Sequence, residues 1–589
     1  MSGRGLSGSA MRSFASAGIA ATLAIAACVS DPSHGAGSGG MNGGTGNSSG
    51  TGNSSGTGNS SGTGNSSGTG NSSGTGGMIG GSGGAPDLTV ACPQAAMGSP
   101  LLRLLTPTEM TNTLNDIFPE VKGMWTSALP AGSVSGYGFD NDASLTIGKQ
   151  LAGGMTDTAL SLATALVGTP LATVLPCSTG AADHACAETF LNKYGRKLFR
   201  RPITTAEHDR FLAFFDASKT KSDFKTALKW MTVGLIQSPN AVYRSEIGTA
   251  MGGMRQLSVY EVATALAYTY GGSTPNADLS AKADSGNLGD PVAIAKTLMA
   301  TDAGKQQLQR FFDGYINYTS VSSIQKPNVT NFSSLSADML QETHAFVNDV
   351  VIQKGGGMKE VLTATTTNPS KALAAFYGFT GAAVPSTDYA SVARPAGRGI
   401  GILAQGAFLS THASSDSSSP TKRGLFPYFR LLCQPTLTPP ANVPQISAPM
   451  PGQKTTRQRY EDVHAQMGSA CMGCHTRFDP IGFAFEHYDE GGRYRDTDNG
   501  LPIDASGSVP TPSGTALTFD GQESVAMALA NMPLIHQCMA AYLATYAFGT
   551  GEACIGASQV PKLQSGAIGI AEAFAQLAAE PHFTKRDPN

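Results

Sequence analysis

The sequence predicts a mainly α-helical protein that follows a disordered N-terminal linker. Beyond Leu101, apolar residues recur at helical spacing, and capping residues precede several of these runs. Sustained period-2 alternation and the strand–helix–strand rhythm of parallel sheets are both missing. Glycine is concentrated near the N-terminus, where residues 35–84 contain 22 of the 72 glycines. The glycine excess therefore indicates a local linker and is not a property of the helical body.

Residues 1–27 have the pattern of a bacterial export signal. Arg4 and Arg12 precede a small apolar run, residues 15–27, that is too short to span a bilayer. The run ends in Ile-Ala-Ala-Cys28, which resembles the lipobox, in which the cysteine is lipidated and becomes the mature N-terminus. We therefore expect lipidation of Cys28. Because Val29 follows it, we expect anchoring to the outer membrane; an ordinary signal peptide is the alternative.

Residues 28–86 are predicted to form a disordered tether. Residues 45–74 are five copies of Thr-Gly-Asn-Ser-Ser-Gly. With scarcely any apolar side chain, this stretch cannot offset its conformational entropy by burial. We expect a flexible coil that separates the lipid anchor from the folded body. The folded body is then expected in the cell envelope, either in the periplasm or exposed at the cell surface.

Helix-start signals predict the elements of the body in chain order. Thr106, Pro107 and Glu109 form an N-cap pattern, with proline at the first helical position and glutamate at the third. Thr204 and Glu207 form a second capping box. The expected helices cover residues 187–199, 224–237, 256–270, 291–301, 337–353 and 534–548.

Proline-rich and motif-bearing segments divide the body into predicted domains. These are an N-terminal helical domain (87–180), a helical domain with an Arg-Arg-Pro motif (181–250), a central helical domain (251–390), a Pro-rich connecting segment (391–460) and a C-terminal domain (461–589). The charges nearly balance, with 39 basic and 42 acidic residues. This balance excludes a basic duplex-binding surface, so we expect no nucleic-acid partner.

Nine cysteines divide into three groups. One is the predicted lipid attachment, two belong to the motif described next, and an even remainder of six is predicted to form disulfides in an oxidising compartment. Buried free thiols are the alternative for these six. Closest spacing pairs Cys177 with Cys186 and Cys538 with Cys554, which leaves Cys92 for Cys433.

The pentapeptide Cys471-Met-Gly-Cys474-His475 predicts one covalently attached haem c. Both thiols would add to the haem vinyl groups, and His475 would bind the iron as proximal ligand. The spacing suits one helical turn, in which residues three apart share a face. A disulfide, a thioredoxin-like redox pair and half of a zinc site are the alternatives. Residues 461–589 are thus expected to form a cytochrome c-like haem domain.

The sixth iron ligand decides between electron transfer and small-molecule chemistry. Met532 is the expected ligand, because it precedes the last long helical run at the place where small cytochromes c supply their methionine. Met527, His487 and His536 are the alternatives.

Three carboxylates follow the haem motif, at Asp479, Glu486 and Asp489. They allow an acid/base interpretation. We favour the alternative in which they cap backbone amides and pair with arginines around the haem propionates, namely Arg477, Arg493 and Arg495.

The order of short motifs along the body resembles a bacterial family of exported multidomain proteins, abundant in planctomycetes and some myxobacteria. The family is described only as domains of unknown function associated with cytochrome c. The motifs are Leu-Leu-Thr-Pro-Thr-Glu (104–109), Leu-Phe-Arg-Arg-Pro (198–202), Ser-Pro-Asn-Ala-Val-Tyr-Arg-Ser-Glu (238–246), Ser-Pro-Thr-Lys-Arg-Gly (419–424) and Asp-Pro-Ile-Gly-Phe (479–483). The motif charges Arg200, Arg201, Arg244 and Glu246 are interpreted as buried ion pairs, with a binding cleft as the alternative.

The resemblance implies a haem-bearing periplasmic or surface protein, and it names neither substrate nor redox partner. Electron transfer is the leading function, either as a relay or in service of an oxidative reaction in the helical body. A haem enzyme with an open sixth position, such as a peroxidase-like activity, is the second hypothesis. A non-haem surface binding protein with a structural disulfide is the third.

Overall fold

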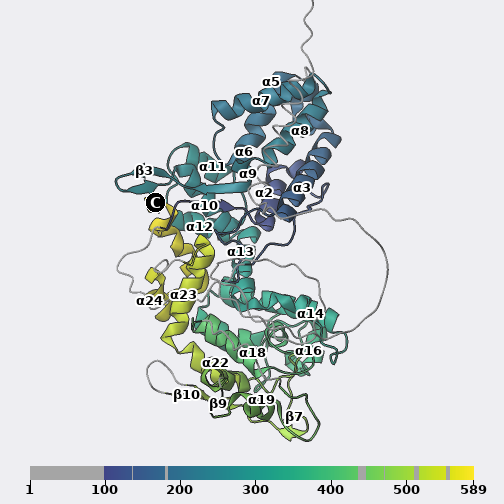
Figure 1. Ribbon diagram of the computed structural model, residues 1–589, viewed down its shortest axis with the longest axis vertical. Coiled ribbons are helices and arrows are strands. Elements are labelled where there is room, and N and C mark those ends of the chain that lie inside the picture. The colour runs from purple at the N-terminus through teal and green to yellow at the C-terminus, as the bar shows by residue number, and fades with distance from the viewer. Residues whose placement is uncertain are drawn as a thin grey trace, which may run out of the picture.

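The protein is mainly helical, as predicted (Figure 1). The computed structural model describes residues 98–134, 137–179, 183–435, 446–467, 469, 471–509, 516–551 and 557–588. The predicted signal peptide, Cys28 and the tether lie outside the described residues. In Figure 1 the blue N-terminal helices occupy one end of an elongated body, and α19, β7, β9 and β10 occupy the opposite end.

The N-terminal helices pack around a core of their own. Fully buried Leu114, Phe190, Phe215 and Met231 lie at its centre. The helices are α2 (Pro107–Ile117), α3 (Lys149–Gly168), α4 (Leu171–Val174), α5 (His184–Phe190), α6 (Arg196–Phe199), α7 (Thr205–Lys219), α8 (Phe224–Ile236) and α9 (Pro239–Val242).

Both capping boxes predicted from the sequence are present. The Thr106 hydroxyl accepts a hydrogen bond from the Glu109 amide, and the Glu109 carboxylate accepts one from the Thr106 amide. Thr204 and Glu207 exchange the same two bonds at the start of α7. The helix predicted over 187–199 is continuous, but residues Leu191–Gly195 form a π-helical segment between α5 and α6.

The central and C-terminal helices share a second, larger core. Leu266 and Phe311 of the central helices belong to the same buried cluster as Phe485, Leu543 and Phe574. The region predicted as a C-terminal domain therefore packs against the central helices instead of enclosing a core of its own. The helices are α10 (Val259–Gly271), α11 (Ala277–Asp284), α12 (Pro291–Met299), α13 (Asp302–Phe312), α14 (Phe332–Val347), α15 (Met358–Thr363), α16 (Lys371–Phe376), α17 (Gly406–Thr411), α18 (Pro420–Phe426), α19 (Thr456–His464), α20 (Met472–His475), α21 (Asp479–Phe483), α22 (Gly521–Ala530), α23 (Pro533–Phe548), α24 (Val560–Gln564) and α25 (Ile570–Gln576).

Short strands form five small antiparallel sheets within the described residues. No sequence signal predicted these strands. One of them shifts a predicted helix: the helix expected from residue 256 begins at Val259, because Gln256 pairs in a strand and Ser258 caps the helix. The strands are β1 (Leu101–Leu104) with β2 (Tyr243–Glu246), β3 (Thr249–Met251) and β11 (Lys585–Arg586) on either side of β4 (Met254–Gln256), β5 (Thr366–Thr367) with β6 (Val392–Ala393), β7 (Thr497–Asp498) with β8 (Leu501–Pro502), and β9 (Ser506–Val509) with β10 (Leu517–Asp520).

Two disulfides are present in the described part of the chain. Cys177 pairs with Cys186, as predicted, with the Cα atoms 5.6 Å apart. Cys433 pairs with Cys538, also at a Cα separation of 5.6 Å. The predicted pairs of Cys538 with Cys554 and of Cys92 with Cys433 are therefore wrong, while Cys92 and Cys554 themselves lie outside the described residues. Sequence proximity failed because the packing of residues 427–433 against α23 decides the pairing.

Among the residues described, we find no helix with the length and apolar character needed to cross a membrane.

Candidate functional site

The C-x-x-C-H motif forms a single helical turn. The amides of Cys474 and His475 both donate to the carbonyl of Cys471, at 3.2 and 3.0 Å, and α20 covers Met472–His475. Both cysteines are free thiols, with Cys471 buried and Cys474 partly exposed. No disulfide joins the two cysteines in this structure. The turn therefore presents two thiols and an imidazole side by side.

Asp479 at the start of α21 anchors this turn. Its Oδ2 atom lies 3.0 Å from Nδ1 of His475 and 2.7 Å from Nδ1 of His464. The hydroxyl of Thr421, on α18, donates to Oδ1 at 2.7 Å. One carboxylate thus joins α18, α19, α20 and α21.

The electrostatics fix the direction of these hydrogen bonds. Burial of Asp479 favours a raised carboxyl pKa, but the hydrogen bonds from His464 and His475 outweigh it and hold the pKa below its usual value. An ionised carboxylate only accepts hydrogen bonds, so Nδ1 donates from both histidines. In a neutral imidazole the lone pair is then at Nε2, which is the atom available to a metal.

Aromatic contacts hold the orientation of the His475 ring. The His464 ring lies 3.5 Å away between centroids at an interplanar angle of 32°, and the Phe478 ring lies 4.9 Å away. His464 covers the face of the His475 ring, whereas a metal approaches a ring nitrogen in the ring plane. A neighbour over the ring face therefore does not itself occupy the metal-binding direction of Nε2.

Two glycines allow α18 and α21 to approach closely enough for Thr421 to reach Asp479. A Cβ atom on Gly424 would lie 1.9 Å from the carbonyl oxygen of Phe478. One on Gly482 would lie 1.8 Å from the carbonyl oxygen of Pro420. Since both obstacles are backbone atoms, only glycine permits this contact at either position.

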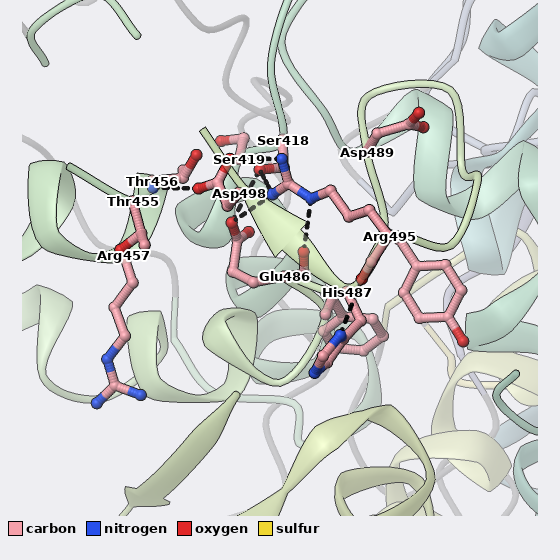
Figure 2. Close-up of polar contacts among 12 residues, drawn as sticks. Ser418, Ser419, Thr455, Thr456, Arg457, Glu486, His487, Asp489, Arg495 and Asp498 are labelled. Carbon is pink, nitrogen blue, oxygen red and sulfur yellow. Dashed lines mark hydrogen bonds and ion pairs between the residues drawn. The ribbon is translucent and has the colours of Figure 1, made fainter. Parts of the chain in front are cut away.

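A buried ion network positions α19, which carries His464 (Figure 2). Glu486 accepts hydrogen bonds from Ser418 at 2.9 Å and from Arg495 at 3.0 Å. Arg495 also donates to Asp498 at 2.6 Å, and Asp498 accepts from the Thr456 amide at the first turn of α19. Burial raises the pKa of the Glu486 carboxyl. Figure 2 shows Arg495 at the centre of this network, so its guanidinium is already occupied within the protein.

The three predicted carboxylates divide into two roles. Glu486 pairs with Arg495, and Asp489 pairs with Arg493 at 2.8 Å, which are two of the expected arginine pairs. Asp479 pairs with two imidazoles instead of an arginine. Sequence reasoning missed His464 and Thr421, because no local spacing rule connects positions 11 and 54 residues before His475.

The candidate sixth ligands lie in different surroundings. Met532 is the N-cap of α23 and packs, partly buried, against the larger core. Met527 is 49% exposed on α22, and the His487 ring stacks on Tyr494. Burial lowers the pKa of His536. Within the described residues, no hydrogen bond or ring contact joins any of these four to His475, so the ligation by Met532 stays a prediction.

The buried motif arginines hold elements together. Glu246 lies within 4 Å of Arg103, Arg244 and Arg586, which come from β1, β2 and β11. Burial alone raises the pKa of Glu246, but the three arginines outweigh it and lower the pKa to about 2. The interpretation as a buried ion pair is confirmed for Arg244 with Glu246. Arg201 pairs with Glu207, but its side chain is 33% exposed. Arg200 instead donates to backbone carbonyls, including that of Asn240.

Three segments of the chain match known family models. Residues 186–246 match PSD5, a protein of unknown function (DUF1595), and residues 257–379 match PSD4, a protein of unknown function (DUF1592). Residues 398–498, which include the C-x-x-C-H turn and Asp479, match PSCyt3, a protein of unknown function (DUF1588). Three segments of the chain are thus similar to domains of unknown function, which supports the multidomain pattern that the motif order implied. No curated protein and no solved structure matches the chain.

Proposed function

We propose that this protein carries one covalent c-type haem on Cys471 and Cys474, with His475 as the proximal iron ligand, and that it transfers electrons. The observation that carries the proposal is the arrangement of two free thiols and an imidazole on one helical turn. The four other described cysteines are all in disulfides. The cytochrome c association of the matched PSCyt and PSD models supports the same function.

The residues present fit this cofactor in their chemistry. Thioether formation needs two reduced cysteines, and both are free. Iron ligation needs a neutral imidazole with Nε2 available, and the bond from Nδ1 to Asp479 provides this tautomer. When bound, a c-type haem supplies one-electron oxidation and reduction.

The exposure of the turn suits exchange of electrons with a partner protein. The His475 side chain is 19% exposed, and Cys474 is partly exposed beside it. His475 contacts His464 of α19, which lies at the end of the molecule opposite the N-terminal helices (Figure 1), so a cofactor attached here would lie near the surface at that end. The redox partner would dock on this end.

The anchored-lipoprotein prediction completes the proposal. Lipidation at Cys28 and the tether would place the folded body at the outer membrane of the cell envelope, where haem is attached to c-type proteins. The alternative haem enzyme differs only in an open sixth position, as in a peroxidase-like activity.

A second candidate function is a non-haem metal centre. The ligand atoms of His464, His475 and Asp479 all lie within 4.8 Å of one another. Two histidines and one carboxylate form the facial ligand set of non-haem iron oxygenases. The non-haem centre needs no thiols, whereas haem attachment needs both motif cysteines. Replacement of these cysteines therefore distinguishes the two candidates.

Replacement of both motif cysteines tests the two candidates. The full chain is produced in a bacterial host that matures c-type cytochromes, and covalent haem is measured after denaturing electrophoresis and from the reduced α-band. We expect haem in the parent protein and its loss in the double variant Cys471→Ala, Cys474→Ala. The variant Cys177→Ala, Cys186→Ala removes another cysteine pair and is the matched control, with haem retained. Absence of haem in the parent, with iron bound and lost in His464→Ala, would reject haem attachment and support the non-haem centre.

A further inference from the structure

We propose that Asp479 is a positioning residue that lowers the reduction potential of the attached haem through His475, and that His464 moderates this effect by sharing the same carboxylate oxygen. The inference rests on the haem attachment proposed above. It adds a regulator of that site which neither the motif nor the matched families assign.

The first step concerns the hydrogen bond to the proximal ligand. Asp479 Oδ2 accepts from His475 Nδ1 at 3.0 Å, and the carboxylate is only 3% exposed. A charge-assisted bond in a buried setting draws the Nδ1 proton toward the carboxylate. This increases the electron density at Nε2 and makes the imidazole a stronger donor. A stronger donor stabilises the more positive, oxidised iron, so the reduction potential falls.

The second step concerns His464. Its Nδ1 atom lies closer to the same oxygen, at 2.7 Å, than that of His475 does. Two donors on one oxygen share its negative charge, so each receives a weaker acceptor than it would alone. His464 therefore weakens the bond to His475 and holds the potential above the value that an unshared carboxylate would give.

The third step concerns orientation. Thr421 donates to the other oxygen, Oδ1, and the rings of His464 and Phe478 pack on His475. Both the carboxylate and the imidazole are thereby held in place. The bond between them is a fixed feature of the fold and so acts on the proximal ligand in every oxidation state.

Two variants with opposite expected effects test the proposal in the haem-loaded full chain. Asp479→Asn removes the negative charge, and we expect a shift of the midpoint potential to a more positive value. His464→Phe keeps a ring stacked on His475 but frees Oδ2 for His475 alone, and we expect a shift to a more negative value. Potentiometric titration of the reduced α-band gives both values. Asp489→Asn, which removes a carboxylate that pairs with Arg493, is the charge-matched control and is expected to shift the potential less than Asp479→Asn.

Equal signs for the two shifts, or no shift in either variant while haem stays attached, would overturn the proposal. A merely structural role would alter the yield of folded protein without opposite changes of potential. Where Asp479→Asn does not fold, Thr421→Val takes its place: removal of the bond to Oδ1 leaves a stronger acceptor for His475, so this variant and His464→Phe are both expected to lower the potential. A rise in either variant would then overturn the proposal. Failure of the parent protein to attach haem would refute the proposed function itself, which is a distinct result.

Discussion

At the scale of single residues, Asp479 is the group that organises the candidate site. Asp479 is buried, and the pKa of its carboxyl is below the usual value. It accepts hydrogen bonds from Thr421, His464 and His475. The C-x-x-C-H spacing predicts the role of His475 directly, because the proposed haem attachment and iron ligation would involve five consecutive residues. The partners of Asp479 come from three other helices, and so their roles emerge only once those helices pack together.

The sixth ligand of the proposed haem iron is a second residue-scale question. Met532→Ala is expected to leave the haem attached, to lower its reduction potential and to let the reduced form bind carbon monoxide, because a methionine ligand raises the potential and closes the site. Absorption spectra with and without carbon monoxide provide the measurement. An unchanged spectrum and potential would remove Met532 as the ligand, and carbon monoxide binding by the parent protein would favour the open-site haem enzyme.

At the scale of elements, the contact between α18 and α21 builds the site. Gly424 and Gly482 bring the two backbones within van der Waals contact, which places Thr421 beside Asp479. The ion network of Glu486, Arg495 and Asp498 then ties the first turn of α19 to the same region. None of these three helices was among those predicted from the sequence, in which residues 391–460 have the pattern of a Pro-rich connecting segment. The close contact between α18 and α21 was not predictable from local spacing either.

Gly482→Ala is expected to destabilise the protein, because the new Cβ atom would meet the Pro420 carbonyl oxygen and force the helices apart. Overpacking of this kind costs about 1–3 kcal/mol, and more where backbone must move. Denaturant unfolding gives the change in free energy. Gly473→Ala is the control, since a Cβ there meets nothing within 4 Å and the position is helical. Equal stability of the two variants would contradict the role assigned to the α18–α21 contact.

At the scale of the whole molecule, distant parts of the chain meet in the larger core. The strand β11, close to the C-terminus, pairs with β4, and α25 packs beside α12. In Figure 1 the yellow C-terminal segment lies close to α12. The disulfide of Cys433 with Cys538 links the segment after α18 to α23 across 105 residues. The C-terminal helices are thereby fastened to the body that carries the C-x-x-C-H turn.

Removal of this disulfide is expected to cost more stability than removal of the other one. In the chain-entropy account, closing a loop of about 100 residues contributes about 4.7 kcal/mol, and a loop of about ten residues contributes about 2.7 kcal/mol. Cys433→Ala, Cys538→Ala should therefore lower the free energy of unfolding more than Cys177→Ala, Cys186→Ala, whose cysteines are 9 residues apart. Chemical denaturation of both variants checks the order, and the reverse order would contradict it.

The sequence by itself determined the helical class, the capped starts of α2 and α7, the Cys177–Cys186 pair and the composition of the C-x-x-C-H turn. These features depend on residues a few positions apart, so local propensity and spacing encode them. Only the tertiary structure decided that Cys433 pairs with Cys538, that β1 pairs with β2 and that His464 joins His475 at Asp479. Each of these depends on where packing brings separated segments together, and burial of the two cores sets that arrangement.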